Sequence, residues 1–279
     1  MSTNEQVTSH YTAADMLQRI DANLAESGVD PEHPTLEALA PFDNFHSRGP
    51  AATLDIIAMA GFPAGARVLD IGGGLGGPAR TLASRSKAHV AVLDLTPSFV
   101  ETGRILTERL GMSNLVEFQV GDGTQTPYAD ESFDGVWTQH STMNIADKAA
   151  LYAEIHRVLK PSGRLAMQEV MQGDAAGATY PLPWATSEQF SFLQPVDEMR
   201  SLIAASGFRE LVWEDESEAV LAVTPVPGAA SSAQLSAQPA GQTVLWGPAF
   251  VERIQNVTRG LRDGKLVIVR ALFERQTSP

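Results

Sequence analysis

Short apolar runs alternate with helical segments along the chain from residue 67 onward. The segments 79–86, 97–110 and 147–159 have the length and the start and stop residues of helices. The apolar runs between them predict strands at Arg67–Ile71, His89–Leu93, Leu115–Val120, Phe133–Thr138 and Arg164–Val170. Strands that alternate with helices in this way imply βαβ units, right-handed crossovers and a parallel sheet. The pattern therefore predicts a doubly wound α/β core.

The chain before this core is expected to be helical. Apolar residues recur at helical spacing over Thr12–Glu26, which predicts an amphipathic helix. A second, short helix is expected from Thr35 to Ala40, because Pro41 favours a helix end. The polar segment Phe42–Gly49 is expected to form a loop before a helix over Ala51–Ala60. We expect residues 1–62 to form a helical lid or cap.

The chain after the five strands is less regular. Gly173–Pro195 predicts an irregular, aromatic insertion, and Thr224–Gly241 has the composition of a flexible loop. We expect residues 63–279 to form one core domain with insertions at 173–195 and 217–264. Regular elements are predicted over Val196–Ser206 and Pro248–Arg262 as helices, Phe208–Glu214 as an edge strand and Leu266–Phe273 as a final strand.

A glycine-rich turn follows the first strand. Gly72, Gly74 and Gly77 satisfy the spacing of a dinucleotide site, and Asp94 lies at the distance expected of a ribose ligand. The same turn, with Asp70 followed by Gly72, Gly74 and Gly76, also resembles the first motif of class I S-adenosylmethionine-dependent methyltransferases. A strand, a glycine turn and a helix start let the backbone approach a small polar ligand closely. The turn alone leaves both ligands open.

Charge and composition narrow the classes of function. The chain has 279 residues, with 33 acidic and 20 basic side chains and a formal charge of −13, which argues against a nucleic-acid surface. The absence of cysteine excludes disulfides, thiolate catalysis and a Cys-ligated metal site. The sequence shows neither a secretory leader nor a long apolar run, so we expect a cytoplasmic protein without membrane contact.

Later segments decide between the two ligands. Gly121-Asp122-Gly123, the segment 130–136 before the fourth strand and the segment 156–165 before the fifth closely resemble signatures of class I S-adenosylmethionine-dependent methyltransferases. Residues 10–12, 42–49, 137–145 and 181–185 narrow the resemblance to the bacterial branch that includes sarcosine and dimethylglycine N-methyltransferases. Gly73 departs from the pattern, because many relatives carry cysteine there.

The resemblance implies a fold, a donor and a set of donor residues. The fold is Rossmann-like, with a mainly parallel seven-stranded sheet that has an antiparallel C-terminal edge. The donor is S-adenosylmethionine, the product is S-adenosylhomocysteine, and no metal is expected. Asp94 is assigned to the ribose hydroxyls and Asp122 to the adenine amino group. The donor residues that the resemblance implies are Arg48, Asp70, Gly72, Gly73, Gly74, Asp94, Leu95, Gly121, Asp122, Gly123 and Gln139.

The acceptor side is less determined. His140 is the leading general base, because an imidazole with an ordinary pKa suits proton removal at neutral pH. The other catalytic candidates are Tyr11, His46 and Glu169, and the candidates for the acceptor pocket are Met143, Asn144, Trp184 and Phe190. Methyl transfer needs in-line attack in a site closed to water, so positioning supplies most of the rate.

Several functions stay open at this point. The leading one is methyl transfer to the nitrogen of a small amine, with the carbon or oxygen of an indole, isoprenoid or phenol as the alternative. An enzyme that keeps the donor without transferring methyl, a binding module and a nicotinamide dehydrogenase are the competing classes. The partner is a small molecule in the leading hypotheses, and a homo-oligomer is left open.

Overall fold

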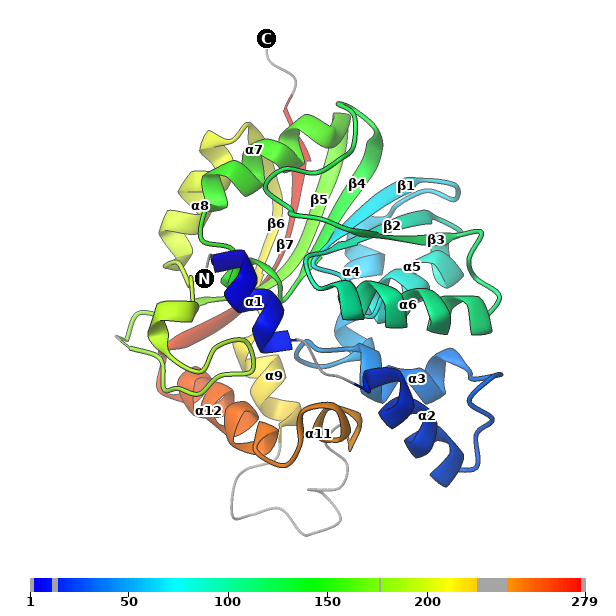
Figure 1. Ribbon diagram of the computed structural model, residues 1–279. Helices are drawn as coiled ribbons and strands as arrows, with labels where there is room; N and C mark the ends of the chain where they lie inside the picture. The colour runs from blue at the N-terminus through cyan, green and yellow to red at the C-terminus, as the bar shows by residue number, and fades with distance from the viewer. Residues whose placement is uncertain (1–2, 12–14, 176, 225–239, 277–279) are drawn as a thin grey trace.

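The computed structural model describes residues 3–11, 15–175, 177–224 and 240–276. Its strands form one seven-stranded sheet in the order β3-β2-β1-β4-β5-β7-β6 (Figure 1). The strands are β1 (Arg67–Ile71), β2 (His89–Asp94), β3 (Val116–Val120), β4 (Phe133–Gln139), β5 (Leu159–Gln172), β6 (Phe208–Asp215) and β7 (Leu266–Arg275).

The pairing of the strands confirms the predicted sheet. β1 pairs in parallel with β2 and β4, and the parallel set extends to β3 and β5. β7 runs antiparallel between β5 and β6, which places β6 at the predicted edge. β5 is longer than its predicted span, because its pairing with β7 continues to Gln172.

Helices cover both faces of the sheet. On one face, α4 (Pro50–Ala60), α5 (Gly77–Ser86) and α6 (Pro97–Arg109) pack on residues such as Val68 and Val90. On the other face, α7 (Lys148–Val158) and α8 (Val196–Ala205) pack on Leu69 and Ile71 (Figure 1). Alternate residues of β1 thus face two buried layers, which is why the strand is apolar on both sides.

A second group of helices lies beyond the carboxyl ends of the strands. It combines α1 (Thr3–Tyr11), α2 (Met16–Glu26) and α3 (Leu36–Asp43) with α9 (Ser217–Val223), α11 (Ala240–Trp246) and α12 (Phe250–Arg262). α11 packs on α2 and α3, so segments about 200 residues apart in the sequence lie side by side there (Figure 1). Two short 3-10 turns complete the fold, η1 at Thr142–Asn144 and η2 at Glu188–Phe190.

Two sequence-based expectations for these segments are corrected, and one helix of the expected cap had no sequence signal of its own. α3 continues through Pro41 to Asp43, because Phe42 is buried against α2 and Asp43 forms a buried ion pair with Arg80. The polar N-terminus forms α1, which has no apolar periodicity to predict it. α11 begins at residue 240, inside the segment expected to be a loop, and residues 225–239 of that segment lie outside the described part of the chain.

The Asp43–Arg80 pair ties three helices together under the glycine turn. Both side chains are buried, and the Arg80 guanidinium donates to the Asp43 carboxylate at 2.7 Å. It also donates to Thr107 Oγ1 at 2.8 Å, so the Arg80 guanidinium on α5 contacts side chains of both α3 and α6. Breaking a buried pair leaves an unpaired charge, which costs about 3–5 kcal/mol.

Within the described chain, no helix is long and apolar enough to cross a bilayer.

Candidate functional site

A cavity of about 800 Å³ opens at the carboxyl ends of β1, β2, β3 and β4. The strand order reverses between β1 and β4, and ligands of doubly wound sheets bind at such a switch point. One end of the cavity is lined by the glycine turn and by the loops after β2 and β3. The other end is lined by α9, α11, α12 and the turn η1.

The glycine turn allows a ligand to lie directly against the backbone. Gly72 and Gly74 have positive φ angles of 73° and 56°, a region that favours glycine. A Cβ on Gly72 would lie 2.5 Å from Ser141 Cβ, and one on Gly73 would lie 2.5 Å from Asp70 Oδ2. A side chain at Gly72 would displace Ser141, and one at Gly73 would require the side chains of Asp70 and Val92 to shift.

Two buried carboxyls lie behind the turn. Asp94 accepts hydrogen bonds from the backbone N–H of Gly74 at 2.9 Å and of Thr96 at 2.8 Å, which leaves lone pairs on both oxygens for a ligand. Asp70 Oδ2 is buried and has no partner among the described residues. Burial and the neighbouring Asp94 charge raise the pKa of Asp70 to about 8. Both features fit a polar, cationic donor.

The carboxylate after β3 is already held by its surroundings. Asp122 Oδ1 accepts from the backbone N–H and the hydroxyl of Thr124, while Oδ2 accepts from Asn4 Nδ2 at 2.6 Å. These bonds hold the pKa of Asp122 below its usual value although burial opposes them. Gly121, Gly123 and Leu95 also line this end of the cavity. The structure thus brings together the residues assigned to the adenosine of the donor.

Gln139 and His46 meet at the centre of the cavity wall. Gln139 Nε2 lies 3.0 Å from His46 Nδ1 and 3.0 Å from Gln168 Oε1. The hydroxyl of Thr53 lies 3.2 Å from His46 Nε2, so both imidazole nitrogens have partners. Burial lowers the pKa of His46 to about 4, which keeps the ring neutral at pH 7.

His140 is the other imidazole at the wall, and its ring nitrogen Nε2 has no partner among the described residues. Its φ of 50° turns the backbone, and its backbone N–H donates to the Gln168 carbonyl at 2.8 Å. The His46 and His140 ring centroids are 6.2 Å apart. Burial, with the nearby His46, lowers the pKa of His140 to about 3, so this imidazole is neutral.

One catalytic candidate and one expected pocket residue lie behind the wall rather than on it. Glu169 is fully buried and accepts from the backbone N–H groups of Ser141 and Thr142, each at 3.1 Å, so it orients the η1 loop. Phe190 packs in the apolar cluster around Trp184 and does not line the cavity. Periodicity marks both as buried or near the site, and only the fold shows which side of the wall each occupies.

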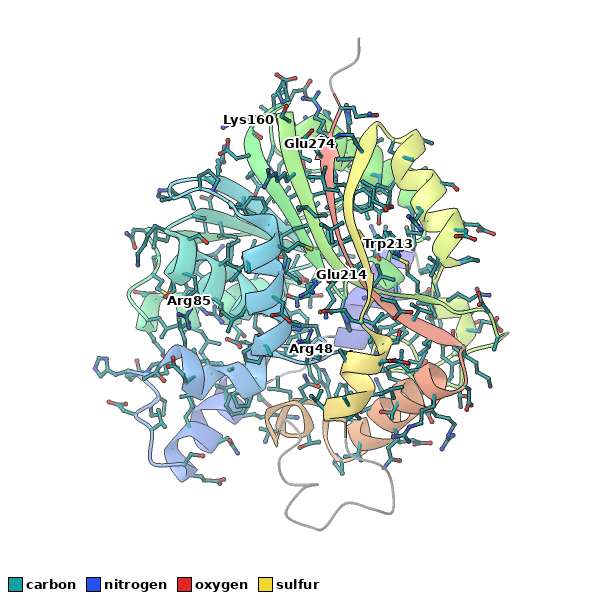
Figure 2. The ribbon with its side chains drawn as sticks, turned by 180° about the vertical axis from the view of Figure 1, so that it is seen from behind. Arg48, Arg85, Lys160, Trp213, Glu214 and Glu274 are labelled. Carbon is teal, nitrogen blue, oxygen red and sulfur yellow. The ribbon has the colours of Figure 1, made fainter. Side chains whose placement is uncertain are left out.

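Arg48 lines the cavity, but its charge is held by acidic neighbours. Its guanidinium donates to Glu216 and to Asp55, each at 2.7 Å. Figure 2 shows Arg48 from behind, near the lower end of β6. Its place among the donor residues stays a prediction. Tyr11 is the last residue of α1, and its side chain lies outside the described part of the structure.

The acceptor end of the cavity has an apolar wall. Met143, Asn144 and Trp184 line it as expected, beside side chains that sequence reasoning did not single out. None of the lining residues that α9, α11 and α12 contribute carries a charge: Val220, Val223, Gln242, Thr243, Trp246, Phe250, Val251, Ile254, Val257, Thr258 and Leu261. The high amphipathicity of α12 is the only sequence signal that could have found part of this wall.

Among residues 3–11, 15–175, 177–224 and 240–276, no group of three or more His, Cys, Asp or Glu side chains is placed to hold a metal ion.

Comparison with protein families and curated proteins supports the donor site. Residues 69–167 match the family described as "Methyltransferase domain". The methyltransferase GfsG of Streptomyces halstedii is 28% identical over 77% of this chain and 77% of its own length. The glycine/sarcosine/dimethylglycine N-methyltransferase of Actinopolyspora halophila is 32% identical over 54% of this chain, a match that spans 27% of the relative.

Solved structures share the whole fold. The [4+2]-cyclase SpnF has a TM-score of 0.70 at 23% identity and covers 99% of this chain and 98% of its own. The geranyl diphosphate C-methyltransferase of Streptomyces coelicolor A3(2), solved with Mg²⁺, a geranyl thiolodiphosphate and S-adenosylhomocysteine, has a TM-score of 0.70 at 17% identity, with 99% and 98% covered. The matched sequence, the sheet order and the glycine turn together identify the chain as a class I S-adenosylmethionine-dependent methyltransferase of small molecules.

Proposed function

We propose that the protein transfers the methyl group of S-adenosylmethionine to a hydroxyl oxygen of a mainly apolar small molecule. The observation that carries the proposal is the acceptor end of the cavity. Its helical wall has no charged side chain, and beside it His140 Nε2 is a buried ring nitrogen without a partner among the described residues. An apolar acceptor packs against such a wall, and its hydroxyl forms the hydrogen bond that His140 Nε2 lacks.

The donor is proposed to lie along the carboxyl ends of β1, β2 and β3. Asp94 accepts hydrogen bonds from the ribose hydroxyls, and Asp122 accepts one from the adenine amino group. The turn at Gly72 leaves room for the methionine part of the donor. When bound, the donor supplies a methyl group on a positively charged sulfur. The protonated state that burial favours for Asp70 ends when the cationic donor arrives, because a nearby positive charge favours the carboxylate.

The residues of the chain position the reaction and receive a proton. His140 Nε2 accepts the hydroxyl proton of the acceptor. Its pKa of about 3 makes it a weak base, but an oxygen that has gained a methyl group is a very strong acid, so a weak base suffices. The apolar wall excludes water and holds the acceptor in line with the donor.

The lid is part of the proposal. α1 reaches the donor site through Asn4, and His10 Nε2 lies 3.0 Å from the Pro183 carbonyl beside the acceptor wall. Asn4 holds the Asp122 oxygen that the adenine amino group would use. We infer that α1 covers both ligands and exchanges the Asn4 contact for adenine when the donor binds.

A small cationic amine fits this wall less well than the sequence resemblance alone suggests. Charged amines are recognised by carboxylates or by aromatic cages, and the helical wall offers the rings of Trp246 and Phe250 but no carboxylate. The likeness to the [4+2]-cyclase SpnF supports a second candidate, in which the apolar cavity folds an acceptor without methyl transfer. Because that identity is 23%, the likeness concerns the fold.

One screen tests these alternatives. Wild-type protein and His140→Gln are incubated with labelled S-adenosylmethionine and size-matched apolar alcohols, phenols, amines and alkenes. We expect methylated hydroxyl products, one S-adenosylhomocysteine per acceptor consumed, and a kcat for His140→Gln lower by roughly 100-fold. Transfer to amines alone, or acceptor consumption without S-adenosylhomocysteine, contradicts the proposal.

A further inference from the structure

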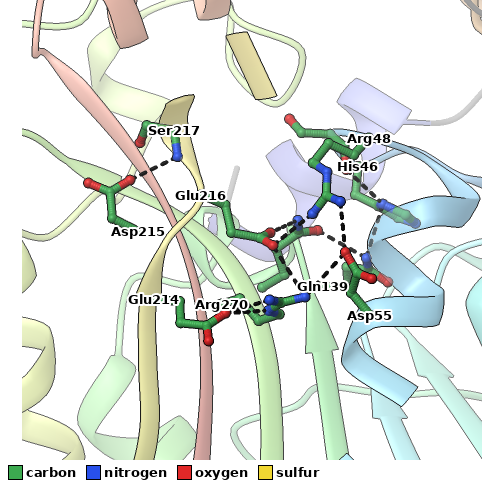
Figure 3. Close-up of polar contacts among 11 residues, drawn as sticks. His46, Arg48, Asp55, Gln139, Glu214, Asp215, Glu216, Ser217 and Arg270 are labelled. Carbon is green, nitrogen blue, oxygen red and sulfur yellow. Dashed lines mark hydrogen bonds and ion pairs between the residues drawn. The ribbon is translucent and has the colours of Figure 1, made fainter. Parts of the chain in front are cut away.

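A chain of hydrogen bonds runs from the cavity wall to a cluster of charges at the edge of the sheet. His46 contacts Gln139, Gln139 contacts Gln168, and the amide nitrogen of Gln168 lies 2.6 Å from Glu216 Oε2 (Figure 3). Every member is buried, and Glu216 is 4% exposed. Gln168 and Glu216 are thus screened from solvent, whereas Gln139 and His46 border the cavity.

Glu216 is the charged end of this chain. Its Oε1 accepts from Arg48 at 2.7 Å, and Arg270 lies 3.4 Å away from the same oxygen (Figure 3). Glu216 forms ion pairs with both arginines, and a carboxylate in an ion pair offers only acceptor oxygens. The group that faces Oε2 must consequently be a donor.

The need for a donor opposite Glu216 Oε2 fixes the orientation of each amide in the series. Gln168 must turn its NH₂ toward Glu216, so its carbonyl oxygen faces Gln139. Gln139 must then turn its own NH₂ toward Gln168, and the second hydrogen of that NH₂ points at His46 Nδ1, 3.0 Å away. Because Nδ1 accepts this bond, the ring proton lies on Nε2.

The hydrogen bonds at the His46 end of this series are consistent with a proton on Nε2. A protonated Nε2 of His46 donates to the Thr53 hydroxyl at 3.2 Å, and that hydroxyl donates to Gln139 Oε1 at 3.4 Å. The opposite direction is also complete: a proton on Nδ1 would donate to the Ser47 carbonyl at 3.3 Å and to a turned Gln139. Only the charged end distinguishes the two.

We propose that Glu216 is a positioning residue, which acts through Gln168 and Gln139 to hold His46 as the neutral Nε2–H tautomer. Both His46 nitrogens are then engaged by the wall. If the proposed function is correct, His140 Nε2 is left as the imidazole nitrogen at the wall that receives the acceptor proton. The tautomer of His46 is a property of the ligand-free protein and can be measured without any methyl acceptor.

The Glu216→Gln variant reverses the chain in a defined way. Arg48 still requires an acceptor, so the amide of the new side chain keeps its oxygen toward Arg48 and turns its NH₂ toward Gln168. Gln168 and Gln139 turn in response, and the His46 proton moves to Nδ1. Adding Gln168→Glu to this variant restores an acceptor beside Gln139, and the proton returns to Nε2.

The experiment is ¹⁵N NMR of histidine-labelled protein at pH 7, with the His46 signals assigned by their loss in His46→Gln. We expect the Nε2–H form in the wild type, the Nδ1–H form in Glu216→Gln, and the Nε2–H form again in the Glu216→Gln/Gln168→Glu double variant. Glu214→Gln is the matched control, because Glu214 also pairs with Arg270 but lies outside the chain. We expect that variant to keep the Nε2–H form.

Either of two results would overturn the proposal: an Nε2–H tautomer that persists in Glu216→Gln, or a double variant that stays in the Nδ1–H form. If Glu216→Gln does not fold, Gln168→Met interrupts the chain at similar volume and is expected to give a mixture of both tautomers. Calorimetry with S-adenosylhomocysteine reads the donor site separately. If Glu216→Gln changes the His46 tautomer but keeps its affinity for S-adenosylhomocysteine, the effect lies in the hydrogen-bond chain and not in the donor site. The tautomer result therefore stands or fails independently of the proposed function.

Discussion

The donor end and the acceptor end of the cavity are built in different ways. The donor end uses backbone groups at the carboxyl ends of β1, β2 and β3, and two of its carboxylates, Asp94 and Asp122, each accept a hydrogen bond from the residue two positions later. The acceptor end uses apolar side chains from α9, α11 and α12, far along the chain. Local geometry therefore determines the donor, whereas packing between distant segments determines the acceptor.

This difference explains which part of the cavity is shared with other proteins. The family match spans residues 69–167 and includes the glycine turn, Asp94 and Asp122. The helical wall lies outside it. A donor end that depends on local geometry can be kept while the wall changes, and variants of each end should therefore have separate effects.

The largest effect is expected from Gly72→Ala. A Cβ there lies 2.5 Å from Ser141 Cβ at a φ of 73°, so the turn must shift where the donor binds. We expect no calorimetric binding of S-adenosylhomocysteine. Gly65→Ala is the control, because Gly65 has a φ of 78° and a Cβ added to it would meet no heavy atom within 4 Å. It should lose about 1 kcal/mol of stability and keep binding. Near wild-type affinity of Gly72→Ala would show that the turn is not the donor site.

Asp94→Asn should weaken binding of S-adenosylhomocysteine by roughly 100-fold, because hydrogen bonds to a charged acceptor contribute about 1.5–3 kcal/mol. Titration with the 2′-deoxy analogue sharpens the assignment. The wild type should lose affinity for the analogue, whereas the variant should bind both compounds alike. Equal discrimination by both proteins would remove Asp94 from the ribose.

Ile254→Asp tests the acceptor end alone. The side chain lines the wall on α12 and is half-buried, so a charge there opposes an apolar acceptor while the fold tolerates it. With an acceptor from the screen, we expect KM to rise by about 10-fold and the affinity for S-adenosylhomocysteine to stay unchanged. Ile254→Leu conserves volume and should leave both values near those of the wild type. A matching loss of donor affinity would mean that the two ends are not separate.

The smallest effect concerns the pH dependence of stability. The pKa of Asp70 is raised to about 8 from its ordinary 3.8, so the folded state binds a proton that the unfolded state releases between these values. Its stabilising contribution is complete below pH 3.8 and is lost as the pH rises through 8. The Tm of Asp70→Asn minus that of the wild type should therefore increase from about pH 5 to about pH 8, by about 3 °C or more. Parallel Tm curves would contradict the raised pKa.

The sequence predicted the sheet and the donor turn because their signals are local. Apolar runs between helices mark β1 to β5, and the glycines at 72 and 74 need no distant partner to show that backbone is exposed there. β6 was also predicted at the edge, where its more polar sequence fits one solvent-facing side.

The acceptor end and the hydrogen-bond chain could not be predicted in the same way. Gln168 and Glu216 are 48 residues apart, and neither has a neighbour in sequence that indicates the contact. Glu169, one residue from Gln168, was singled out instead, because alternation along a strand does not show which face reaches a cavity. α9 ends just before the segment 224–241, whose composition favours a loop, and α11 begins at the end of that segment.

The ion pair between Asp43 and Arg80 has a consequence for how the molecule melts. Arg80 belongs to the helix that follows the glycine turn, whereas Asp43 ends a helix of the cap, and both are buried. Unfolding the cap alone would strand a charge in the core, so α3 and the sheet should unfold as one cooperative unit. Slow amide hydrogen exchange in α3, at the rate of α5, would be the signature of that cooperativity.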